Sequence, residues 1–211
     1  MTQQYLDALS AGGAHATFFD IGNNIWDGSD PNPDHMSLYT TMAPAEVAAG
    51  DIVGDHSLNH ESYTGASTGQ PPLTDAQETA QVQGQQQIAA QQLPGYTENL
   101  FRPPYGDMNQ QGFNLLQSLG FTDVMWTTDT NDWQSPPTAT IVQRFLAGAT
   151  DQAVILQHDG YPSTVAAIPQ ELAGLKSMGL CPGKIVPTST PNPKFPTDYN
   201  GLPNHWQVVP F

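Results

Sequence analysis

The spacing of apolar residues along the chain predicts helices that alternate with short strands. Residues at helical spacing predict helices at 2–12, 43–50, 74–93, 109–119, 138–147 and 163–178. Apolar runs between them predict strands at 16–19, 51–55, 100–101, 122–128 and 153–157. Thr74 is the expected N-cap of the longest helix, which ends before Pro94. Such alternation indicates an α/β fold with a largely parallel sheet covered by helices.

Two segments interrupt this alternation. Residues 27–34 are rich in Gly, Pro, Asn and Asp, which predicts a loop. After Gly183 the chain is Pro-rich and aperiodic, so we expect a domain over residues 1–183 and a tail over residues 184–211. This tail either packs on the domain, with Trp206 and Phe211 as anchors, or forms a flexible end.

Length and charge restrict the class of protein. A chain of 211 residues is most simply one domain with a substantial core. It has 5 Lys and Arg against 20 Asp and Glu, a net charge of −15, which disfavours nucleic-acid and membrane-surface binding. No apolar run is long enough to span a bilayer, and the first residues lack the features of a signal peptide. Cys181 is the only cysteine, and is either a simple free thiol or a residue whose disulfide partner is lost.

His56 and His60 form the clearest candidate metal site. They are two of six histidines and lie four residues apart, just after the apolar pair Ile52 and Val53. Imidazoles at this spacing can bind one divalent metal ion, although such a pair is also common on polar surfaces. Because a catalytic zinc normally has three protein ligands and water, a carboxylate is the expected third ligand.

Other reactive residues follow predicted strands, where α/β barrels place their active sites. These are Asp20, Arg102 in Arg-Pro-Pro-Tyr-Gly, Asp129 in Asp-Thr-Asn-Asp-Trp, and His158 in Leu-Gln-His-Asp. The sequence has no serine elbow, phosphate loop, dinucleotide fingerprint or Cys-x-x-Cys pair. The expected reaction is therefore attack by metal-activated water on an amide or ester carbonyl.

Five segments, in this order, resemble the polysaccharide deacetylase family, also called the NodB-homology domain or carbohydrate esterase family 4. They are residues 16–19, 54–60, 101–106, 129–133 and 156–159. Fungal-type chitin deacetylases resemble the chain most among the branches of the family, and the resemblance extends over about residues 2–179. It implies a distorted (β/α) barrel and a metal-dependent hydrolase that removes N-acetyl groups from N-acetylglucosamine polymers such as chitin or chito-oligosaccharides. It also implies a secreted or cell-wall location, and we expect a monomer.

The resemblance assigns a metal site and a proton donor. His56 and His60 match the family's metal-binding histidines, where the usual ion is zinc, with Co, Mn and Ni as alternatives. His158 matches the general acid that protonates the leaving amine. Asp129 matches the carboxylate that orients this histidine. Leu156 is implied to line a pocket for the acetyl methyl group.

The remaining matches lie around the substrate. Arg102 matches the arginine that positions the catalytic base, and the backbone N–H of Tyr105 matches the donor to the oxyanion. Pro104 and Trp133 are expected beside the sugar, with Trp133 as a wall of the groove.

One family motif has no counterpart in this chain. Family members carry Thr-Phe-Asp-Asp-Gly on a strand ahead of the first predicted helix, and its aspartates are the base and the third metal ligand. We therefore expect a barrel without its first strand, with an open edge. Asp20 either substitutes as the base or is a strand-end aspartate bonded to a nearby turn. Further hypotheses are a catalytically silent carbohydrate-binding relative and a truncated fragment of an active enzyme.

Overall fold

The structure is a computed structural model that describes residues 1–23 and 38–211. The predicted loop at 27–34 lies outside the described residues. The described helices are α1 Thr2–Ala11, α2 Leu38–Ala49, α3 Asp75–Gln92, α4 Gln110–Ser118, α5 Thr138–Gly148, α6 Pro162–Val165 and α7 Ile168–Ser177. The strands are β1 Thr17–Asp20, β2 Ile52–Asp55, β3 Leu100–Phe101, β4 Thr122–Asp123, β5 Thr128–Asp129, β6 Ile155–Leu156, β7 Gly183–Pro187 and β8 Trp206–Pro210. Two 3₁₀ helices, η2 Pro104–Gly106 and η3 Asp132–Gln134, follow β3 and β5.

These elements confirm the predicted alternation, with three differences. The predicted strand at 122–128 is two strands, because the chain passes from one sheet to another between β4 and β5. The predicted helix at 163–178 is two helices, and Pro169 lies in the first turn of the second, where its missing N–H is tolerated. Helix α2 begins at Leu38, before the expected start, and contains Pro44.

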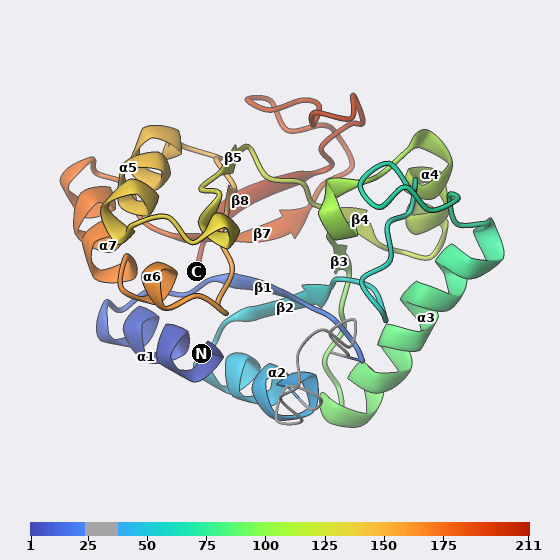
Figure 1. Ribbon diagram of the computed structural model, residues 1–211, viewed down its shortest axis with the longest axis horizontal. Helices are drawn as coiled ribbons and strands as arrows, with labels where there is room; N and C mark the ends of the chain where they lie inside the picture. The colour runs from blue at the N-terminus through green and yellow to red at the C-terminus, as the bar shows by residue number, and fades with distance from the viewer. Residues whose placement is uncertain (24–37) are drawn as a thin grey trace.

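Parallel pairing dominates the sheets. One sheet has the order β1-β2-β3-β4 and a second contains β5 and β6, with every pair parallel. The helices surround these strands, with α1 and α2 below them, α3 and α4 on one side and α5 to α7 on the other (Figure 1). The fold is therefore the expected α/β arrangement, and it matches a distorted barrel.

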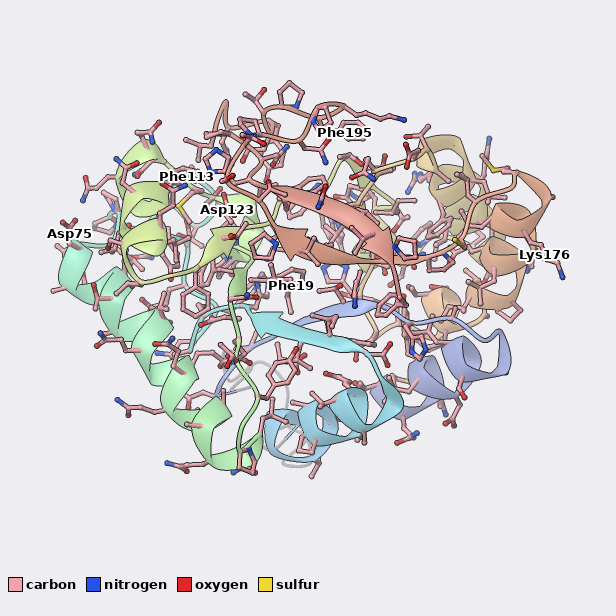
Figure 2. The ribbon with its side chains drawn as sticks, turned by 180° about the vertical axis from the view of Figure 1, so that it is seen from behind. Phe19, Asp75, Phe113, Asp123, Lys176 and Phe195 are labelled. Atoms are coloured by element: carbon pink, nitrogen blue, oxygen red, sulfur yellow. The ribbon has the colours of Figure 1, made fainter. Side chains whose placement is uncertain are left out.

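Alternate residues of each strand face the helices or the interior. Phe18 of β1 faces outward and packs with Leu6 and Leu9 of α1 and Ile168 of α7. Phe19, its neighbour, faces the interior and packs against a core of strand and ribbon residues, namely Leu100, Val124, Val154, Ile185 and Trp206. Figure 2 shows Phe19 near the centre, between β2 and the β7–β8 ribbon. This alternation decides which side chains at the strand ends can reach a common site.

The segment after Gly183 packs on the domain, which was one of the two expected outcomes. Strands β7 and β8 form an antiparallel ribbon. Trp206 is fully buried, packs with Leu100 and Val124, and its Nε1–H donates to Asn204 Oδ1. Phe211 is largely exposed, although its ring centroid lies 5.0 Å from that of His15. The predicted boundary between domain and tail, at residues 183 and 184, falls within β7, which begins at Gly183. This boundary stays a prediction.

In the part of the chain that the structure describes, each helix is too short or too polar to cross a membrane. Cys181 is exposed and is a free thiol.

Candidate active site

The loop after β2 places His56 and His60 side by side. Their ring centroids are 4.9 Å apart and the rings meet edge to face. His56 Nδ1 lies 2.6 Å from the carbonyl oxygen of Arg102, so Nδ1 carries the proton and Nε2 is left with its lone pair. Burial lowers the pKa of both histidines, to about 4 for His60, and neighbouring cationic groups add to the effect, chiefly His60 for His56 and His158 for His60. Both imidazoles are therefore neutral near pH 7, the form that binds metal ions.

The backbone of this loop is held in an uncommon conformation. Ser57 and His60 have φ of 70° and 59°, in the left-handed region, which costs of order 1–3 kcal/mol for each such residue other than glycine. Local hydrogen bonds hold the loop, since Asp55 Oδ1 accepts from Ser57 N and Ser57 Oγ accepts from His60 N. Strain that is maintained in this way is typical of functional sites.

The donor chemistry of the pair fits a divalent metal ion, but the pair is incomplete. Two neutral imidazoles suit zinc, and also cobalt or nickel. Among the described residues, no group of three His, Cys, Asp or Glu side chains is placed to bind one ion. Asp55 is fully buried and its carboxylate turns back onto Ser57. The described chain thus offers two of the three protein ligands that a catalytic zinc normally has.

Asp20 does not supply the third ligand. Asp20 lies two residues after Phe18 on β1, so its side chain is on the same face of the strand, toward the helices. There its carboxyl group is hydrogen-bonded to Glu46 of α2. Burial raises the pKa of Asp20 to about 7, and burial together with the Asp20 charge raises that of Glu46. Asp20 borders the same cavity as His56, but Glu46 engages its carboxyl group, which does not favour Asp20 as a substitute base. The hydrogen-bond partner of Asp20 is the side chain of Glu46 on a helix, whereas the alternative prediction for Asp20 was a hydrogen bond to a nearby turn.

The Asp20 and Glu46 pair makes stability depend on pH. Because both folded-state pKa values lie above the unfolded ones, stability is complete below about pH 4 and falls as pH rises, through about 7 for Asp20 and about 11 for Glu46. Glu46→Gln removes a carboxyl group that must stay protonated in the folded state, and keeps a group that can donate to Asp20. At about pH 8 we expect it to raise the free energy of unfolding by at least about 1.4 kcal/mol, the equivalent of one pKa unit. Urea denaturation at about pH 4 and pH 8 measures the difference, with the exposed Glu61→Gln as control. A larger gain at the acidic pH would contradict the prediction.

His158 follows β6 and is held by Asp132. Its Nδ1 lies 2.8 Å from Asp132 Oδ1, and its backbone N–H donates to Asp132 Oδ2 at 2.7 Å. Thr164 of α6 also donates to Asp132 Oδ2. Burial raises the pKa of Asp132, but the hydrogen bonds from His158 and Thr164 outweigh it and hold the pKa below its usual value. The ionised carboxylate thus fixes the Nδ1 side of His158, whose side chain is 43% exposed, and leaves Nε2 to meet a substrate.

The prediction that Asp129 orients His158 was wrong, because Asp132 holds this position. Asp129 Oδ1 accepts from the backbone N–H of Asn131 and caps the turn. Asn131 has a φ of 51°, and this left-handed residue turns the chain into η3, which places the fully buried Asp132 beside the histidine. The Asp-x-x-Asp motif contains both Asp129 and Asp132, and only the local backbone conformation decides which of them reaches His158. Thr164 was also missed, because nothing near it in sequence indicates that α6 packs under this loop.

Arg102 is a buried cation that forms no close ion pair within the described residues. Its side chain is 8% exposed, its Nε–H donates to Val124 O at 3.0 Å, and its guanidinium carbon lies 4.1 Å from the ring centroid of Phe19. No Asp or Glu of the described residues lies within ion-pair distance of it. Burial lowers the pKa of Arg102 to about 10, the charge of nearby Asp123 opposes this shift, and the guanidinium stays charged near neutrality.

The exposed surface of the site is aromatic. Tyr105 is 48% exposed, has a φ of 60° and lies with its ring centroid 4.6 Å from that of His60. Trp133 in η3 is 50% exposed. Pro104 is buried, so the structure does not support its predicted contact with the sugar. Leu156 is buried in the cavity wall, and its role, like that of the Tyr105 N–H, stays a prediction.

A cavity of about 520 Å³ lies between the segments of β1 and β6. Residues 16–20 of β1 line one part, residues 153–159 around β6 line another, and His56, Arg102 and His158 all reach it. We call this cavity the β1–β6 slot.

Comparisons with known proteins agree with the fold. The sequence profile of the family described as Polysaccharide deacetylase matches residues 1–124, more than half of the chain. The chain belongs to the polysaccharide deacetylase family. A family 4 carbohydrate esterase from Streptomyces lividans, solved in complex with acetate, has a TM-score of 0.76 and 30% identity, covering 100% of this chain and 91% of that one.

Two curated relatives of this deacetylase domain are bacterial. The peptidoglycan-N-acetylglucosamine deacetylase PgdA of Listeria monocytogenes is 32% identical over 85% of the chain, which spans only 34% of that protein's length. The chitooligosaccharide deacetylase of Rhizobium leguminosarum bv. trifolii is 30% identical over 85% of the chain and 72% of that protein. These relatives support the family and do not single out the fungal-type branch.

Proposed function

We propose that the chain is a metal-dependent hydrolase that removes N-acetyl groups from polymers of N-acetylglucosamine, with chitin or chito-oligosaccharides as substrates. The observation that carries this proposal is that His56 of the His56–His60 pair and His158 of the His158–Asp132 pair line the same cavity. The similarity to a chitooligosaccharide deacetylase supports the choice of substrate.

His56 and His60 would hold the metal ion, with zinc as the first candidate. When bound, such an ion polarises the scissile carbonyl and lowers the pKa of a water molecule. The hydrogen bond from His56 Nδ1 to the Arg102 carbonyl keeps Nε2 available for this purpose.

His158 would act on the leaving group. Its Nε2–H donates a proton to the amine nitrogen as the C–N bond breaks, and Asp132 stabilises the charged imidazole from the other side. The Tyr105 backbone N–H would donate to the developing oxyanion. The exposed rings of Tyr105 and Trp133 offer apolar faces against which sugar rings can stack.

The surroundings of the site suit this substrate class. A net charge of −15 favours a neutral polymer, or a cationic one such as partly deacetylated chitin, over an anionic polymer. We further propose that the chain acts as a monomer in a secreted or cell-wall setting, where such polymers occur.

Acetate release from a panel of substrates tests this function. The panel contains N-acetylated chito-oligosaccharides, peptidoglycan fragments and acetylated xylan, each incubated with the zinc-supplemented chain. We expect release from the chito-oligosaccharides at the highest kcat/KM. Preferred release from peptidoglycan or xylan would overturn the choice of chitin, and release from none of the three would overturn the enzymatic proposal.

A catalytically silent carbohydrate-binding protein is the second candidate. It is favoured by one observation, that the described residues offer only two protein ligands for a metal ion. This candidate predicts that chito-oligosaccharides bind, that Trp133→Ala weakens their binding, and that no acetate is released.

A further inference from the structure

Tyr199 is an exposed aromatic residue that the proposed deacetylation does not use. Its side chain is 58% exposed, against 48% for Tyr105 and 50% for Trp133. It belongs to the segment between β7 and β8, outside the residues 1–124 that the family profile matches. A single exposed tyrosine is ordinary on a protein surface, so its function has to be inferred from the residues around it.

A closed turn holds Tyr199 in place. The backbone N–H of Asp198 donates to Leu202 O, and Asp198 Oδ1 accepts from Leu202 N, both at 2.9 Å. Gly201 closes the turn with a φ of 79°, a conformation that favours glycine. Leu202 is 4% exposed and belongs to the same core cluster as Phe101. An aromatic side chain on such a turn is already ordered, so it loses less conformational entropy when it binds a ligand.

The turn is attached to η2, the 3₁₀ helix that carries Tyr105. Asn200 Nδ2 donates to Gly106 O at 2.9 Å. Tyr199 Oη lies so close to Gly106 that any side chain at this glycine would collide with it. Tyr105, the residue before Gly106, has its ring centroid 4.6 Å from that of His60. A polymer whose reacting unit lies beside His60 and Tyr105 can therefore reach Tyr199 with a neighbouring unit.

The charges around Tyr199 disfavour an anionic ligand. Three partly exposed carboxylates act on its hydroxyl group, those of Asp198, Asp107 and Asp129. Burial, followed by the aspartate charges, raises the pKa of Tyr199, so the hydroxyl stays protonated and can donate a hydrogen bond. Burial raises the pKa of the fourth neighbour, Asp123, to about 8, so this carboxyl group is largely uncharged near pH 7. The nearby cation Arg102 is buried and offers a ligand little compensation. A sugar that carries a carboxylate would therefore be repelled here, and a neutral or cationic sugar would not.

We propose that Tyr199 binds a second sugar unit of the polymer, next to the unit that reacts, and that this subsite favours N-acetylglucosamine or glucosamine over a sugar that carries a carboxylate. The apolar face of a pyranose ring would stack on the ring of Tyr199, and the tyrosine hydroxyl would form a hydrogen bond at the edge of the sugar. The ring centroid of Trp126 lies 5.6 Å from that of Tyr199, so Trp126 restricts the movement of this ring. The inference rests on the proposed function and adds the kind of sugar that lies beside the reacting unit.

Calorimetry on the metal-free chain, with the N-acetylated chito-oligosaccharide of four units as ligand, tests the contact with Tyr199. We expect Tyr199→Ala to weaken binding of this tetramer at least about tenfold. Tyr199→Phe keeps the aromatic face and should lose less than about threefold. The control is Phe211→Ala, which removes an exposed aromatic ring beside His15 and should bind as the parent chain does. A tetramer that does not bind, or an affinity that Tyr199→Ala leaves unchanged, would overturn the subsite.

A tetramer with a carboxymethyl group on every unit tests the choice of sugar. We expect the parent chain to bind it at least about tenfold more weakly than the unmodified tetramer. Asp198→Asn keeps the oxygen that accepts from Leu202 N and removes one charge, so it should narrow this difference about twofold. Equal affinities for the two tetramers, or a difference that Asp198→Asn leaves unchanged, would contradict the preference.

These binding measurements need neither metal nor turnover, so the two proposals fail separately. Acetate release without any dependence of binding on Tyr199 would overturn the subsite alone. Binding that depends on Tyr199, without acetate release from the zinc-supplemented chain, would overturn the deacetylation and leave the sugar contact in place.

Discussion

Replacing Asp132 by Asn is expected to lower kcat for acetate release by about 10²–10⁴-fold. The carboxylate accepts from His158 Nδ1 and from the backbone N–H of the same residue, and Thr164 completes its hydrogen bonds. An amide at this position cannot stabilise the imidazolium that forms when His158 acts as an acid, and it can present its NH₂ group to Nδ1. Steady-state kinetics on N-acetylated chito-oligosaccharides measure the loss, which should fall on kcat and leave KM little changed.

Asp129→Asn is the matched control for this prediction. Asp129 is three residues away and caps a turn through Asn131, without contact to the histidine. Its replacement should change kcat by less than about tenfold. Equal losses in the two variants, or the larger loss for Asp129→Asn, would contradict the assignment of Asp132. Melting curves of both variants separate a catalytic loss from a folding loss.

Replacing His56 by Ala is expected to weaken zinc binding by at least about 10²-fold and to reduce acetate release to the background. The variant removes one of only two imidazoles that the described chain places together, so one ligand cannot hold the ion. It also frees the carbonyl oxygen of Arg102. Competition with a chromogenic chelator measures the affinity for zinc.

His205→Ala is the control for the metal prediction, because His205 lies beside Gln117 and Phe113, among residues that take no part in the site. Its zinc affinity and acetate release should equal those of the parent chain. If His56→Ala binds zinc as tightly as the parent, the metal site lies elsewhere and the role assigned to the pair is wrong.

The sequence predicted those parts of the site that depend on local spacing. His56 and His60 were found because a four-residue interval within one loop already restricts their separation. His158 and Arg102 were found because each follows a short apolar strand, and parallel strands bring their C-terminal ends to one edge. Because side chains alternate between the two faces of a strand, those of Arg102 and His158 face the interior.

Contacts that depend on a distant segment or on one backbone angle were not predictable. The choice between Asp129 and Asp132 depends on the left-handed conformation of Asn131. The position of Asp20 at a strand end predicted a candidate base, and the sequence did not indicate that Glu46 of the distant helix α2 contacts its carboxyl group. The β1–β6 slot is likewise a property of which strands pair, and a list of strands does not contain it.

The most direct test of the account measures zinc and acetate in one preparation of the chain, with zinc added in one sample and a chelator in the other. The account predicts about one zinc ion per chain, bound through His56 and His60, and release of acetate from chito-oligosaccharides that the chelator abolishes. Acetate release that survives removal of the zinc, or bound zinc without any release, would contradict it.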